Sequence, residues 1–161
     1  METKTQMSIA VNKEQFFKEE FIPLLKKLKG GEKGKWGVLS PQGMIEHMTD
    51  SIGVAWGRID LPLHTPENVL QRYRDFALSD KEFKPDTKNA LMTAEAPPLR
   101  NNNITTAVAE LEKEIESLLI FHKAKPDAIV LNPFFGDFNY NEWIYLLYKH
   151  AVHHLKQFDL M

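Results

Sequence analysis

Two histidines, His150 and His154, stand one helical turn apart in a segment whose apolar residues recur with helical spacing. At about 100° per residue, they fall with Trp143, Leu147 and Phe158 inside one arc of about 80°. Side chains at i and i+4 lie about 5–6 Å apart at Cβ, close enough to bind one metal ion. Two imidazoles buried side by side need polar partners, and a divalent cation would satisfy both. The alternative is that each one hydrogen-bonds to backbone or polar side chains in the core.

Four more histidines occupy less specific positions. His47 lies at the border of the apolar stripe of an earlier helical segment, which suits a ligand at the mouth of a helical bundle and equally suits an exposed side chain. His153 lies at the edge of the paired-histidine face, His64 is predicted on the surface, and His122 is predicted to cap a helix C-terminus. Gln157 lies on the paired-histidine face, where it either orients a ligand or water or is an ordinary boundary residue.

The composition excludes several other kinds of chemistry. The 161 residues include no cysteine, which rules out disulfides, thiolate metal ligands and a thiol nucleophile within the chain. The segment GGEKGK at 30–35 superficially looks like a phosphate-binding loop, but it lacks the first glycine, the Ser or Thr and the preceding strand of that motif. There is no HExxH metalloprotease pattern, no Glu-x-x-His pair and no dedicated acid or base.

Charge and hydropathy also limit the partners. The formal net charge is -2 at pH 7, so no electropositive field attracts nucleic acid. No apolar run approaches the roughly 20 residues of a membrane span, and none near the start has the length of a signal-peptide core. We therefore expect a cytoplasmic protein whose partners include neither nucleic acid nor membrane.

The apolar periodicity predicts four amphipathic helices in one domain over 1–161. Ser40 followed by a proline is a strong helix start, as is Asn139 with Glu142 three residues later. Asn12 is predicted to cap the first helix, and Pro23 to kink it. We predict an all-α four-helix bundle with a long crossover between its second and third helices. The predicted core helices are about 12–29, 40–57, 104–122 and 140–158, with the crossover at 58–103.

The crossover is long enough that we expect it to cover or line something, and LQRYRDFAL at 70–78 could form a short helix or strand. All four arginines, at 58, 72, 74 and 100, fall in or beside it. They could bind a substrate carboxylate or make surface salt bridges.

Three segments together resemble one family. SPQGMIEHM in the second predicted helix, NPFFGDFNYNEW before the fourth, and YKHAVHHLKQF at the end resemble the DinB/YfiT-like superfamily, in particular its branch called domain of unknown function 1569. The resemblance implies a four-helix bundle with one divalent metal ion, often nickel or zinc. It also implies three histidine ligands, one from the second helix and two from the last, which are His47, His150 and His154 in this chain.

The resemblance further implies a metal-dependent enzyme, a transferase or hydrolase acting on a small molecule. Characterised relatives use low-molecular-weight thiols such as bacillithiol or mycothiol. Since this chain has no cysteine, any reacting thiol must come from outside. The alternative is a non-catalytic helical bundle, a stress-related or partner-binding protein with a structural or incidental metal. A homodimer formed through bundle faces is compatible with either function.

Overall fold

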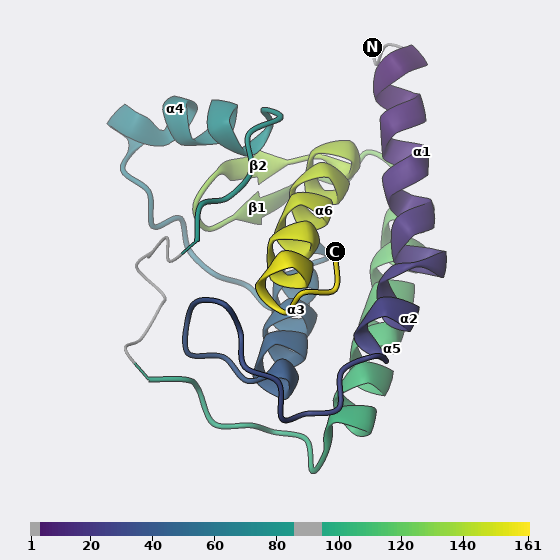
Figure 1. The fold of residues 1–161 in the computed structure, drawn as a ribbon. Helices are drawn as coiled ribbons and strands as arrows, with labels where there is room; N and C mark the ends of the chain where they lie inside the picture. Colours follow the sequence, from purple (N-terminus) through teal and green to yellow (C-terminus); the bar gives the residue numbers. More distant parts are fainter. Residues whose placement is uncertain (1–3, 86–94) are drawn as a thin grey trace.

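The chain is mostly helical, as its periodicity predicts (Figure 1). The computed structural model describes residues 4–85 and 95–161. None of the helices in these residues is long and apolar enough to cross a membrane. In chain order the elements are α1 (Lys4–Glu19), α2 (Phe21–Leu25), α3 (Pro41–Ala55), α4 (Glu67–Ala77), α5 (Ile104–Ala124), β1 (Val130–Asn132), β2 (Gly136–Phe138) and α6 (Tyr140–Gln157).

The long helices lie alongside one another, and α4 with the small sheet covers one end (Figure 1). α3 packs against α5, α1 packs against α6, and α3 also contacts α6. The core between them is apolar and drawn from every long helix. Its deeply buried members include Phe17, Phe21, Leu25, Met44, Met48, Ile52, Leu111, Leu118, Trp143, Ile144 and Leu147.

The first predicted helix differs most from the structure. α1 begins at Lys4, so Asn12 lies inside the helix, and the predicted cap is wrong. Gln15, its expected capping partner, instead donates to Glu19. The helix is interrupted at Glu20, between α1 and α2. Pro23 has no N–H for the residue 19 carbonyl and its ring crowds that carbonyl, so the break falls about one turn before the proline.

The starts of α3 and α6 are confirmed. Ser40 Oγ accepts a hydrogen bond from Gly43 N at 3.0 Å, ahead of Pro41 at the first helical position. Asn139 and Glu142 form a reciprocal capping box at the start of α6. α5 begins at Ile104 as predicted, with Asn103 as its cap, and ends two residues beyond the predicted end, at Ala124.

The crossover contains α4, so the segment at 70–78 is a helix rather than a strand. Crossover positions 86–94 lie outside the described residues. Beyond α5 the chain forms an antiparallel β1–β2 hairpin, in which Val130 pairs with Phe138, that is not predicted from the sequence. Strands of three residues are too short to show an alternating pattern.

A buried lysine fastens α4 to α6. The Lys149 Nζ lies over the rings of Phe76 and Phe83, and it donates a hydrogen bond to the Phe76 carbonyl oxygen at 2.8 Å. It also reaches the carbonyl of Ser79 at 3.3 Å. These acceptors are carbonyls at the end of α4, where a cation is favoured. The lysine therefore fixes α4 and the segment after it against the face of α6.

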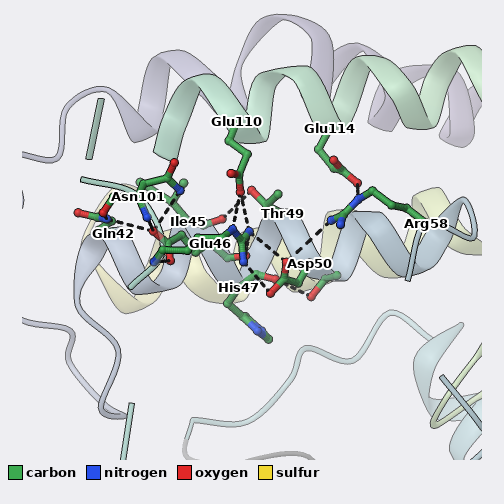
Figure 2. Close-up of polar contacts among 12 residues, drawn as sticks. Gln42, Ile45, Glu46, His47, Thr49, Asp50, Arg58, Asn101, Glu110 and Glu114 are labelled. Carbon is green, nitrogen blue, oxygen red and sulfur yellow. Dashed lines mark hydrogen bonds and ion pairs between the residues drawn. The ribbon is translucent and has the colours of Figure 1, made fainter. Parts of the chain in front are cut away.

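A second polar network fastens α3 to the segment that leads into α5 (Figure 2). Glu46 is only 6% exposed, and its carboxylate accepts from Arg100 N at 2.9 Å, Asn101 N at 3.1 Å and Gln42 Nε2 at 3.0 Å. Burial by itself would raise the pKa of Glu46, but these hydrogen bonds together outweigh it and lower the pKa from 4.5 to about 2. The carboxylate is therefore charged wherever the protein is folded near neutral pH.

The same network contains a row of ion pairs between α3 and α5 (Figure 2). The Arg100 guanidinium pairs with Glu110 at 2.6 Å and with Asp50 at 3.0 Å. Arg58 pairs with Glu114 at 2.5 Å. The hydrogen bonds that Arg100 donates to Glu110 and Asp50 raise its pKa above the ordinary value, despite the cost of burial.

We predict that Glu46→Gln destabilises the protein by about 1–3 kcal/mol, because an amide cannot accept all the hydrogen bonds that the carboxylate receives. The pKa of Glu46 is lower in the folded state than its ordinary 4.5. Its contribution, about 3 kcal/mol, is therefore present above pH 4.5 and lost as pH falls toward 2. Urea unfolding at pH 7 and pH 3 measures both effects. The exposed Glu112→Gln is the matched control, and equal stability of the two variants at pH 7 would contradict the prediction.

Candidate metal centre

The structure brings together the three histidines that the family resemblance implies as ligands. His47 projects from α3, and His150 and His154 project from α6. His150 Nε2 lies 3.0 Å from His47 Nε2 and 2.9 Å from His154 Nε2. One ring nitrogen from each lies within 4.8 Å of the other two. Three nitrogens from two helices therefore converge on one point.

Exposure differs across the three histidines. His154 is 6% exposed, His150 is half-buried and His47 is exposed. His47 points away from the Arg100 ion pairs, on the other side of α3 (Figure 2). Among the described residues, the cluster is therefore covered on the His154 side and most exposed on the His47 side.

Hydrogen bonding cannot account for both close contacts of the His150 ring. Its Nε2 touches two other Nε2 atoms. In a neutral imidazole this atom either carries a proton and donates it, or carries a lone pair and accepts one. It can make only one of the two contacts as a hydrogen bond. The other contact then places two N–H groups or two lone pairs against each other. A cation between the rings removes the conflict, because three lone pairs can all point at it.

Gln157 fixes the proton of the most buried ring. Its Nε2 donates to the Trp36 carbonyl oxygen at 2.7 Å, so its Oε1 faces His154 Nδ1, also at 2.7 Å. A carbonyl oxygen can only accept, so Nδ1 carries the proton and Nε2 keeps its lone pair toward the other histidines. Ligating histidines are commonly held in this way by a second hydrogen bond. Of the two alternatives for Gln157, the structure therefore supports the one in which it orients a histidine.

The cluster favours neutral imidazoles. Burial lowers the pKa of His150 well below 6.5, and repulsion from His154 and His47 lowers it further. Burial and repulsion from His47 lower the pKa of His154 to about 3, against the opposing effect of the hydrogen bond that it donates to Gln157. Near pH 7 both rings are therefore neutral, the form that binds a metal ion.

The remaining histidines lie outside the cluster. His64 is exposed, as predicted. His122 does not cap α5 as predicted: it is 3% exposed, and its Nε2 lies 2.9 Å from the carbonyl oxygen of Ala55 at the end of α3. His153 Nε2 accepts from Trp36 Nε1 at 3.3 Å. With Nε2 occupied by the indole, His153 is a neighbour of the site rather than a ligand.

Three of the four arginines, and Glu142, form ion pairs away from the histidine cluster. Arg74 pairs with Glu142 at 2.6 Å, within the cap of α6, while Arg58 and Arg100 belong to the row between α3 and α5. The sequence left two roles open for the arginines, binding a substrate carboxylate or making salt bridges. These three make salt bridges. In the described part of the chain, the metal-ligating group contains no carboxylate.

Two aromatic residues that the sequence analysis did not connect with the site lie beside it. Trp36 comes from the segment between α2 and α3, with its ring centroid 5.2 Å from that of His153. Phe83 comes from the crossover, 6.2 Å from the His150 ring and 6.1 Å from the His153 ring. The crossover thus lines the site, as its length led us to expect. Neither aromatic residue belongs to a periodic pattern, so no local signal could have found them.

No family model, curated protein or solved structure matches the chain.

We predict that metal-free protein loses stability as pH falls from 6.5 to 4.5. The folded-state pKa values of His150 and His154 lie below 6.5, so the unfolded chain binds more protons in this window and is favoured. These two sites can contribute up to about 2.7 kcal/mol per pH unit. Urea unfolding in the presence of a chelator measures the slope.

His150→Phe should reduce that slope without abolishing it, because burial also lowers the pKa of the histidines that remain, at 47, 122, 153 and 154. An identical slope in the variant and the unaltered protein would mean that His150 is protonated equally in the folded and unfolded states.

Proposed function

We propose that this chain is a divalent-metal-dependent enzyme in which His47, His150 and His154 hold one nickel or zinc ion. Its α1–α2, α3, α5 and α6 would then be the four helices of a DinB-like bundle. The observation that carries the proposal is the His150 Nε2 atom, which lies 3.0 and 2.9 Å from two other imidazole nitrogens and cannot satisfy both by hydrogen bonding.

Three neutral histidines suit a catalytic site, since they leave at least one coordination position for water or substrate. When bound, the metal ion would lower the pKa of a water or thiol beside it and make either a nucleophile near neutral pH. The role of the chain is to hold the three rings neutral, to close the His154 side and to leave the His47 side open. A transferase or hydrolase acting on a small molecule fits these roles.

We further propose a low-molecular-weight thiol as a substrate. The chain has no cysteine, so a sulfur nucleophile would have to enter from outside. Trp36 and Phe83 flank the histidines and offer aromatic surface to the carbon atoms of such a molecule. The neutral site attracts an anionic thiolate once it holds a dication.

The second candidate function is a non-catalytic bundle that binds a partner and holds a structural or incidental metal. The absence of a carboxylate from the metal-ligating group, among the described residues, favours it, because no acid or base then stands ready to move a proton. The two functions differ in whether an external ligand can reach the metal.

Elemental analysis of untagged protein should find about one divalent metal ion per chain, as expected for a single three-histidine site. His150→Ala should reduce the metal to background, because the remaining two nitrogens make a weak site. His64→Ala, which removes an exposed histidine outside the cluster, is the matched control. Full metal content in the His150 variant would overturn the ligand assignment.

Addition of 2-mercaptoethanol to cobalt-loaded protein should produce a new sulfur-to-cobalt absorption band. The chain has no cysteine, so the protein itself cannot give this band. Ethylene glycol, the oxygen analogue, is the control ligand. A spectrum that saturating thiol leaves unchanged would instead support the non-catalytic bundle.

A further inference from the structure

The segment between α2 and α3 is folded around the side chain of Gln157. Lys35 N donates to the Gln157 backbone carbonyl at 2.8 Å, and Gln157 Nε2 donates to the Trp36 carbonyl at 2.7 Å. Lys35 also forms an ion pair with Asp159 at 2.6 Å. Gln157 is 3% exposed although it lies in the last turn of α6. We call residues 33–39 the Trp36 loop.

Two glycines let the Trp36 loop approach Gln157 this closely. A Cβ on Gly34 would lie 3.1 Å from Gln157 Cγ and 3.0 Å from the Trp36 carbonyl oxygen. A Cβ on Gly37, where φ is +77°, would lie 3.0 Å from Gln157 Nε2. Gly34 and Gly37 of GGEKGKWG thus serve close packing on a glutamine rather than phosphate binding.

The geometry points to Gln157 as a positioning residue that links the Trp36 loop to the metal ligand His154. One end of its amide accepts from His154 Nδ1 and the other donates to Trp36. The loop therefore sets the orientation of the amide, and the amide sets the tautomer and angle of the ring. This inference rests on the proposed function, because it assigns Gln157 a role toward the metal that His154 would hold.

His153 gives the Trp36 loop a second attachment that does not touch a ligand nitrogen. Its Nε2 accepts a hydrogen bond from Trp36 Nε1, and the His153 side chain also forms a hydrogen bond with the backbone of Phe83. The two attachments can be separated by mutation: Gln157 joins the loop to a ligand, whereas His153 joins it to the crossover. Loss of the His153 attachment should loosen the loop and leave the His154 tautomer in place.

The test compares Gln157→Leu with Gln157→Glu by two measurements. The first is nickel affinity by competition with a chromophoric chelator, and the second is the ¹⁵N chemical shifts of His154 in metal-free protein. Leucine removes both hydrogen bonds, so we expect a 10–100-fold loss of nickel affinity and loss of the single Nδ1–H tautomer. Glutamate still accepts from His154 but cannot donate to Trp36. It should keep the tautomer and the affinity, while hydrogen exchange at Lys35, Trp36 and Gly37 becomes faster.

Gly37→Ala and Gly30→Ala form a matched pair that leaves every polar side chain intact. Both glycines have positive φ, but a Cβ at Gly30 meets no atom within 4 Å, whereas one at Gly37 meets Gln157. Gly37→Ala should weaken nickel binding severalfold and Gly30→Ala should not. His153→Gln should accelerate exchange in the Trp36 loop without changing the affinity.

The inference is overturned if Gln157→Leu binds nickel as tightly as the unaltered protein, or if His154 in metal-free protein carries its proton on Nε2. Failure of the unaltered protein to bind nickel or zinc would instead overturn the proposed function. The tautomer measurement needs no metal, so the two failures are distinguishable.

Discussion

The position of His150 Nε2 is the constraint on which the site depends. This atom lies about one hydrogen-bond length from two other imidazole nitrogens, one on its own helix and one on α3. The pair on α6 follows from helical spacing alone, since i and i+4 side chains are neighbours. The contact with His47 requires α3 and α6 to have a definite separation and a definite rotation about their axes. A rotation of either helix by one residue would carry a ring away from the cluster.

Two buried charges resist such rotations. Glu46 immediately precedes His47 on α3, and Lys149 immediately precedes His150 on α6. Each is less than a tenth exposed, and each is bonded to a segment outside the helix pair: Glu46 to the chain entering α5, Lys149 to the carbonyls that end α4. An uncompensated buried charge is costly, so a rotated helix that broke these bonds would be strongly disfavoured. The two charges therefore hold the adjacent histidines at the angle that the cluster needs.

Local patterns in the sequence could predict much of this arrangement. Ser40 and Asn139 identified the starts of α3 and α6, because capping depends on residues three positions apart. The same rule failed at Asn12, since a polar residue inside a helix costs only about 0.7 kcal/mol and a cap-like spacing can occur there. Lys149 lies about 100° from His150 around the axis of α6, and no local pattern indicates that α4 buries it. Gln157 and Trp36 are 121 residues apart, so their bond depends on the tertiary fold and has no local signal.

The charge balance around the histidines bears on what the site can bind. The rings are neutral, and the group that orients His154 is an amide rather than the carboxylate found behind many metal-bound histidines. Burial lowers the pKa of His47, and Asp50, the carboxylate that opposes this shift, is already paired with Arg100 and Arg58. A dication held here would therefore keep most of its charge. The least costly way to balance that charge would be an anionic ligand from outside, and the exposed His47 side would be its route of entry.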